Sequence, residues 1–187
     1  MKELISRSWF GLVVCLLVTL TGCSEDEDEV VGKKVAKAEV RVDVTLSEDA
    51  LDLLSLHVQG KVTESGHLQQ NEVVVASTSK RCFFTATKFP ATIEAPVSVS
   101  LKKLPTTLKD KYDLQYKVEY MVIVTYDDGS NEAFDGGPMG FGVSAGYTGA
   151  VADEEDLTYF LNLIKEEIEE KCNFAKTLEV KNGKISL

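Results

Sequence analysis

The chain has 187 residues, of which 44% are hydrophobic and 27% are charged, and its formal net charge at pH 7 is −10. This length suits one domain with a single core, and the hydrophobic content excludes a chain that is disordered throughout. A surface of this sign repels phosphate backbones and gains nothing from anionic lipid head groups, so we expect no nucleic-acid partner.

Residues 1–22 have the pattern of a cleavable export signal. Lys2 and Arg7 form a short basic region, and an apolar run from Trp9 to Leu20 follows. A helix that spans a bilayer needs about 20 apolar residues, so this run is too short to span but suits a signal peptide. Leu20-Thr21-Gly22-Cys23 resembles the lipobox of bacterial lipoproteins. The resemblance implies cleavage before Cys23 and lipidation of its thiol, which would anchor the mature protein in a membrane.

An acidic run follows Cys23. After Ser24 come five carboxylates, from Glu25 to Glu29. Adjacent like charges stay solvated, so residues 23–37 are expected to form an acidic tether. The run also resembles the export signal that sends Bacteroidetes lipoproteins to the cell surface. That resemblance implies an outer-membrane location with the protein facing the cell exterior.

Alternation of apolar and polar residues dominates from residue 38 to residue 135 and predicts antiparallel strands. The segments with this pattern are 39–46, 54–62, 68–76, 81–88, 93–101, 112–126 and 131–134. A short helical turn is expected after Ser47, which can cap it. Polar turns at Glu64–His67 and Asp127–Ser130 predict hairpins. Pro96 interrupts one segment and favours an edge strand or a bulge there.

The pattern changes towards the C-terminus. Residues 136–149 contain six of the 13 glycines and are expected to form a loop or an irregular strand. Acidic residues 153–156 open a helix whose apolar stripe continues to Ile168 and which ends near Cys172. Asn182-Gly183 predicts a type I′ turn in a terminal hairpin. The expected fold is therefore mainly β: an antiparallel β-sandwich over residues 38–187, immunoglobulin-like or related, with one C-terminal amphipathic helix and a terminal β-hairpin.

Several segments resemble a recurrent β-rich domain of Bacteroidetes lipoproteins. They are Ser47-Glu48-Asp49-Ala50-Leu51, the strand pair around Gly66, Thr85-Ala86-Thr87-Lys88-Phe89-Pro90-Ala91, and Tyr112-Asp113-Leu114. Together they cover residues 38–130. The resemblance implies a β-rich fold and a surface location, and it names no chemistry.

Two cysteines remain in the folded part, Cys82 and Cys172. An exported protein meets an oxidising compartment, where a disulfide between them could form and stabilise by about 4 kcal/mol through chain entropy. The alternative is a pair of buried thiols that pack as small apolar residues. Both remain open because the sequence does not place the two Cα atoms within bridging distance.

No catalytic residue is expected. Gly142-Val143-Ser144-Ala145-Gly146 matches the G-x-S-x-G nucleophile pattern, but that motif needs a strand-to-helix turn and a later histidine base. Both histidines, His57 and His67, precede it. A chance match in a glycine-rich segment is the better interpretation. We therefore expect no enzymatic activity and no cofactor.

Residues with the chemistry to bind metal or carbohydrate have simpler explanations. Oxygen-bearing side chains crowd the turn from Asp127 to Glu132, but their spacing is not that of an EF-hand, and the histidines and cysteines lack the spacing of a zinc site. A polar turn without metal is expected. Four tyrosines share one strand face, and core packing is favoured over a row of binding platforms. They are Tyr112, Tyr116, Tyr120 and Tyr126.

Two functions from different classes remain. The first is a non-enzymatic β-sandwich module, lipid-anchored and displayed on the cell surface, that binds or scaffolds an extracellular protein or glycan. The second is a small subunit of a surface assembly, similar to fimbrial subunits that also begin as lipoproteins. Retention of the lipid on Cys23 is expected for the first, and its removal by a further cut is expected for the second.

Overall fold

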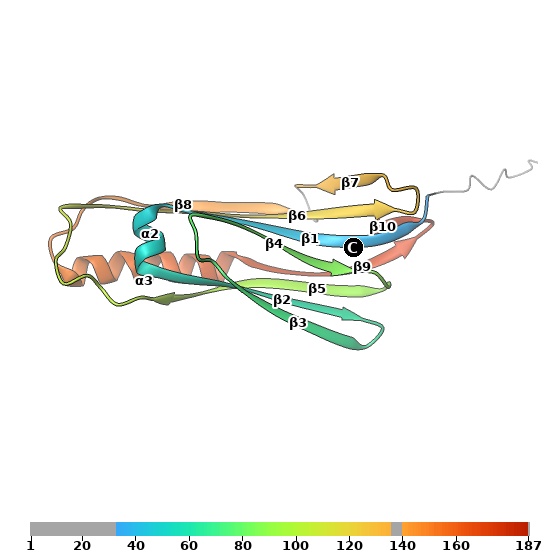
Figure 1. Ribbon diagram of the computed structural model, residues 1–187, viewed down its shortest axis with the longest axis horizontal. Coiled ribbons are helices and arrows are strands. Elements are labelled where there is room, and N and C mark those ends of the chain that lie inside the picture. Colours follow the sequence, from blue (N-terminus) through green and yellow to red (C-terminus); the bar gives the residue numbers. More distant parts are fainter. Residues whose placement is uncertain (1–32, 136–139, 187) are drawn as a thin grey trace, which may run out of the picture. The chain divides into compact units, whose positions relative to one another are not determined.

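Two antiparallel β-sheets and two helices make up the part of the chain that the structure, a computed structural model, describes: residues 33–135 and 140–186 (Figure 1). In chain order the elements are β1 (Val35–Leu46), α2 (Glu48–Leu53), β2 (Leu54–Glu64), β3 (His67–Val74), β4 (Ser79–Ala86), β5 (Ala91–Leu101), β6 (Lys111–Tyr126), β7 (Asn131–Phe134), β8 (Phe141–Ala150), α3 (Glu154–Lys171), β9 (Asn173–Lys181) and β10 (Lys184–Ser186). The β-sandwich predicted from the alternation is confirmed, with its C-terminal helix and terminal hairpin. The signal segment, Cys23 and the acidic run lie outside the described residues.

The first sheet has β4, β1 and β6 side by side, and β7 and β8 both pair with β6 along its other edge. The 16-residue β6 is long enough for both partners: β8 pairs with its first part and β7 with its last. Val42 lies opposite Tyr120 in the register of β1 with β6. Directly opposite residues share a face of a sheet, so the apolar positions of both strands point to the same core.

The second sheet has the order β10-β9-β5-β2-β3. The expectation that Pro96 marks an edge strand or a bulge is wrong, because β5 lies between β2 and β9 and keeps one register with β2 on both sides of Pro96. Pro96 is accommodated at the last pair with β9, opposite Asn173. The next N–H, that of Val97, donates to the carbonyl of Cys172 at 2.9 Å.

The core lies between the inward faces of the sheets. Fully buried residues include Val40 and Val42 of β1, and Leu56 and Ile93 of the second sheet. Burial of such a side chain contributes about 1.5–3 kcal/mol before ordering costs. Gly60 is required in β2, because a Cβ there would collide with the ring of Phe84 from the opposite sheet.

The helix α3 begins as predicted, with Asp153 as its N-cap, whose Oδ1 accepts hydrogen bonds from the N–H groups of Glu155 and Asp156, both at 3.0 Å. The helix packs against β5 and β8 and buries one stripe of side chains, namely Leu157, Leu161, Ile164 and Ile168. Beyond Asn173, the first residue of β9, the helix lies beside β5, where Glu169 Oε1 accepts a hydrogen bond from the Val99 N–H at 3.1 Å.

Two boundaries differ from those expected. β1 begins at Val35, so residues 35–37 belong to the sheet and not to the tether. The glycine-rich segment from Phe141 onward is a regular strand, β8, in unbroken register with β6. Gly146 allows this close pairing, because its φ is 153° and a Cβ there would collide with the Leu114 carbonyl. The type I′ turn is confirmed, with φ of 51° at Asn182 and 74° at Gly183.

Candidate functional site

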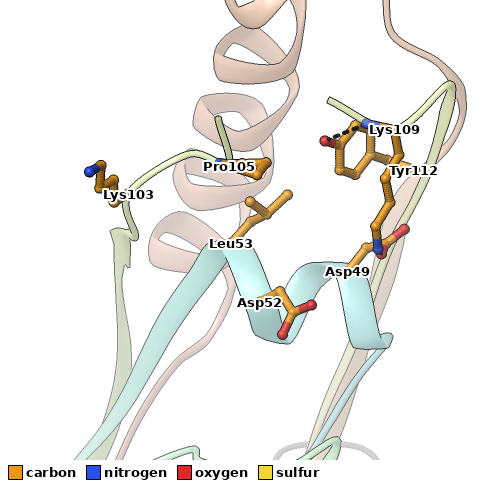
Figure 2. A pocket seen from close by; sticks show the side chains of 7 residues that line it. All are labelled: Asp49, Asp52, Leu53, Lys103, Pro105, Lys109 and Tyr112. Atoms are coloured by element: carbon orange, nitrogen blue, oxygen red, sulfur yellow. Dashed lines mark hydrogen bonds and ion pairs between the residues drawn. The ribbon is translucent and has the colours of Figure 1, made fainter. Parts of the chain in front are cut away.

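A pocket of about 150 Å³ lies where α2 meets the loop between β5 and β6 (Figure 2). Its lining combines an apolar floor with two carboxylates, two ammonium groups and a phenol. The lining residues are Asp49, Asp52, Leu53, Lys103, Pro105, Lys109 and Tyr112. None of these seven is a histidine, cysteine or serine, so the lining offers hydrogen-bonding and charged groups but no thiol or hydroxyl nucleophile paired with an imidazole base.

Asp49 holds the walls of this α2 pocket together. Ser47 caps α2 by accepting from the Ala50 N–H at 3.4 Å, which sets Asp49 in the first turn. One Asp49 oxygen accepts from the Asp113 N–H at 2.8 Å, and the other lies 2.5 Å from Lys109 Nζ. Partial burial acts to raise the pKa of Asp49, but these contacts outweigh it and lower that pKa below its ordinary value. The carboxylate therefore stays charged and fixes the loop.

The other two charged groups of the α2 pocket are available to a ligand. Within residues 33–135 and 140–186, neither Asp52 nor Lys103 makes an ion pair. Figure 2 shows the Lys103 side chain on the far side of Leu53 and Pro105 from the Asp49–Lys109 pair. In the part of the chain that the structure describes, the pocket thus has an unpaired carboxylate on α2 and an unpaired ammonium group at its rim.

The α2 pocket lies far from the start of the domain. β1 begins at Val35 and ends at Leu46, immediately before α2. Its 12 residues span about 40 Å at the usual rise of a strand. The chain therefore enters the sandwich at one end, and α2 lies at the other (Figure 1). The pocket lies at the α2 end, because α2 supplies part of its lining.

Two further hollows flank the sheets. A groove of about 200 Å³ lies between the edge strands β3 and β4, with Gln69 and Asn71 on one side and the half-exposed Phe83 on the other. A hollow of about 140 Å³ on the outer face of the first sheet contains Arg41 and Asp43. Its charges are largely satisfied, since Asp43 lies 2.9 Å from Arg41 and 2.5 Å from Arg81.

The sequence-predicted cysteine pair is buried in its reduced form. Cys82 on β4 and Cys172 at the end of α3 are both free and buried in the structure. Burial raises the pKa of both thiols above the ordinary value, that of Cys172 to about 12, with the Glu167 carboxylate adding to the effect at Cys172. Neither thiol is a reactive nucleophile in this state.

The remaining sequence candidates lie apart from one another. Ser144 is exposed in the middle of β8, opposite Lys117, and not on a strand-to-helix turn. His57 lies on β2, where its ring nitrogens contact Ser55 at 3.0 Å and Glu72 at 2.8 Å. His67 begins β3. The structure does not bring these residues together around Ser144.

The polar turn uses its own carboxylates. Asp128 accepts hydrogen bonds from the Ser130 N–H and hydroxyl and forms an ion pair with Lys33 at 2.9 Å, and these contacts lower its pKa. Asp127 Oδ1 accepts from the Lys34 N–H at 3.1 Å. Both carboxylates of the turn therefore bind the residues that precede β1. Among the described residues, no group of three or more His, Cys, Asp or Glu side chains is placed to hold a metal ion.

The tyrosine row is core, as favoured. Tyr112, Tyr116 and Tyr120 are buried, and only Tyr126 at the end of β6 is partly exposed. The Tyr120 hydroxyl lies 3.0 Å from the carbonyl oxygens of both Ala95 and Cys172 and can donate its single hydrogen to either. This side chain thereby links both sheets at the point where α3 becomes β9.

Comparison of the chain with protein-family models, with curated proteins and with solved structures gave no match. No helix in the described ranges is long and apolar enough to cross a membrane. The chain is classed by its fold, as an antiparallel β-sandwich with a C-terminal helix.

Proposed function

We propose that the protein is a non-enzymatic binding module, anchored by lipid on Cys23 and displayed on the cell surface, with the α2 pocket as its binding site. The observation that carries the proposal is the position of this pocket at the end of the sandwich opposite Val35, where the tether joins. A ligand site at that end is the farthest along β1 from the point where the tether joins, so attachment of the tether leaves it accessible to large extracellular partners.

The chemistry of the α2 pocket suits a small polar group on a larger partner. Its volume of about 150 Å³ is below the usual range of pockets that enclose a whole drug-sized ligand, about 300–1,000 Å³. Two carboxylates balance two ammonium groups, so the pocket does not select strongly for either sign of charge. A sugar unit of a glycan or a polar side chain of a protein fits these properties, and we propose an extracellular glycan or protein as partner.

Anchoring is tested with Cys23→Ala. We expect the substitution to abolish incorporation of labelled fatty acid and to move the protein from the membrane fraction to the soluble fraction. Cys23→Ser serves as a close structural control, since it keeps the shape of the residue but lacks the thiol. Membrane association without fatty-acid incorporation in the unchanged protein would overturn the proposed anchor.

Display is tested in the same cells with Lys103→Cys at the α2 pocket and a maleimide that cannot cross membranes. The native Cys82 and Cys172 are buried and provide a low background. We expect labelling of Lys103→Cys on intact cells. Labelling that requires cell lysis would place the domain inside the outer membrane.

Binding to arrays of polysaccharides and extracellular proteins should be reduced by joint alanine substitution of Asp52 and Lys103, if the α2 pocket is the site.

The assembly-subunit alternative is separated by mass spectrometry of the mature N-terminus. A lipid-modified Cys23 supports the displayed module. An N-terminus produced by a second cut after Cys23 supports a subunit that loses its anchor during assembly.

A further inference from the structure

The edge strand β3 is exposed on both faces and weakly protected against pairing with another strand. It is eight residues long, carries a single carboxylate, Glu72, and exposes Leu68 by 56% and Val74 by 50%. In the described part of the chain it pairs only with β2. Proteins usually protect such an edge by shortening it, by interrupting it or by placing charges along it.

The other edge strands show these protections. β7 and β10 have four and three residues. β4 carries Lys80 and Arg81, and β8 contains Gly146 in a conformation that few other residues adopt. β3 is therefore the edge of this molecule best suited to accept a further strand.

In β3, the backbone N–H and C=O groups of every second residue point away from β2. The Val75 N–H donates to the Leu56 carbonyl at 2.9 Å, so residue 75 faces β2. Antiparallel strands alternate the side on which N–H and C=O groups point. Odd-numbered residues of β3 thus bond to β2, and the groups of Leu68, Gln70, Glu72 and Val74 point outward. These four residues can accept a complete antiparallel ladder.

The side chains of β3 favour one register with a second copy of β3. If Asn71 lies opposite Asn71 of the second copy, Leu68 faces Val74 of that copy, and Gln70 faces its Glu72. The two exposed apolar residues then cover each other, and no two like charges meet. A shift of two residues in one direction places Glu72 opposite Glu72, and a shift in the other places it opposite Leu68. Cross-strand pairs of matched character stabilise a sheet, and opposed like charges destabilise it.

We propose that two copies of this chain associate through antiparallel pairing of their β3 strands about a two-fold axis at Asn71. The second sheet of one copy and that of the other then form one continuous sheet. The contact is isologous, so both copies use the same surface and the assembly closes as a dimer. The interface is one strand pair wide and lies at the small end of specific interfaces, so the dimer is concentration-dependent.

The register is tested by oxidative cross-linking of Asn71→Cys in the full chain. Asn71 lies at a non-hydrogen-bonded pair, where the two Cα atoms approach to about 4.5 Å, within the range of a disulfide. We expect rapid formation of a covalent dimer. The matched control is Gln69→Cys on the same face of β3, because the proposed register separates its two copies by about 14 Å along the strands. The unchanged protein gives the background from its native cysteines.

Association is tested independently by sedimentation velocity over a range of concentrations. Gln70→Glu places a new carboxylate opposite Glu72 of the second copy, twice in the dimer, and we expect dimerisation to weaken by about tenfold. Gln70→Glu combined with Glu72→Lys replaces both repulsions with attractive pairs and should restore the dimer. These residues are exposed, so the fold is retained.

Three outcomes would overturn the proposal. One is a protein that stays monomeric at the highest accessible concentration. Another is equal cross-linking of Asn71→Cys and Gln69→Cys, which would indicate random collision. The third is a double variant that fails to recover while its thermal unfolding is unchanged.

Discussion

Three polar groups buried between β6 and α3 affect the stability of the protein at high pH. Burial raises the pKa of Tyr116, Tyr120 and Cys172 above their ordinary values. Tyr116 differs from Tyr120, whose hydroxyl lies 3.0 Å from two carbonyl oxygens. No hydrogen bond of acceptable geometry reaches its hydroxyl among the described residues, although the Glu167 carboxylate is near enough to raise its pKa further.

These raised pKa values predict alkaline destabilisation. The folded state retains protons that the unfolded chain releases from pH 9.0 for the cysteine and pH 10.0 for the tyrosines. The stability that these three neutral side chains contribute is therefore fully present below pH 9 and is lost as the pH rises towards 12. Urea unfolding at pH 8, 10 and 11 measures this loss.

Tyr116→Phe should reduce the loss above pH 10, because it removes one ionisable hydroxyl without leaving a bonded partner. Tyr159→Phe is the control, since Tyr159 is 59% exposed. A free energy of unfolding that stays constant from pH 8 to pH 11 would contradict the role of these groups.

Sequence reasoning at the residue scale identified buried tyrosines but missed the α2 pocket. Alternation along a strand is a local pattern, and it predicts core positions for Tyr112, Tyr116 and Tyr120. Asp49 and Lys109 are 60 residues apart, and no local motif contains both. Their pairing depends on the path of the loop before β6, which no local spacing specifies.

At the scale of elements, α3 is the clearest case of a correct local prediction with an unknown partner. Its apolar stripe and acidic start predicted the helix, and the structure shows that β5 and β8 cover the stripe. The interpretation of Pro96 failed for a related reason. A proline predicts a missing donor but not which neighbouring strand stops pairing there. Here Pro96 lies opposite Asn173, the first residue of β9, and α3, which precedes β9, lies along the same side of β5.

Leu161→Asp tests the packing of α3. Leu161 is fully buried, so a carboxylate there leaves a charge in the core, and we expect a loss of about 3 kcal/mol or more. For a domain of this size the melting temperature of the monomer should fall by about 10 °C. Leu163→Asp on the opposite face is the matched control, because Leu163 is 44% exposed. An unchanged melting temperature for Leu161→Asp would show that the stripe is not packed within the monomer.

At the scale of the whole molecule, both sheets and α3 share one core. Its buried residues include Cys82 from the first sheet and Cys172 from the junction between α3 and β9. The alternation in the sequence predicted strands that could build such a core. It could not predict their order, because the pairing of β1 with β4 and β6, or of β5 with β9, joins segments far apart in the chain.

A single core predicts that Cys82 and Cys172 become accessible together. In increasing urea, iodoacetamide should modify both thiols across one transition, which coincides with the loss of β-sheet circular dichroism. Mass spectrometry of the two peptides measures each site separately. Modification of Cys172 well before Cys82 would show that α3 and β9 unfold before the sheets.

The central position of β1 determines how the domain carries mechanical load. The chain enters through β1, which is bonded to β4 on one side and to β6 on the other. Those hydrogen bonds lie perpendicular to the strand. A pull on the residues before Val35, resisted at the α2 pocket, acts along β1 and loads both ladders in shear. Many bonds then bear the force at once and cannot open one after another, so a load applied between the residues before Val35 and α2 does not peel β1 from its neighbours.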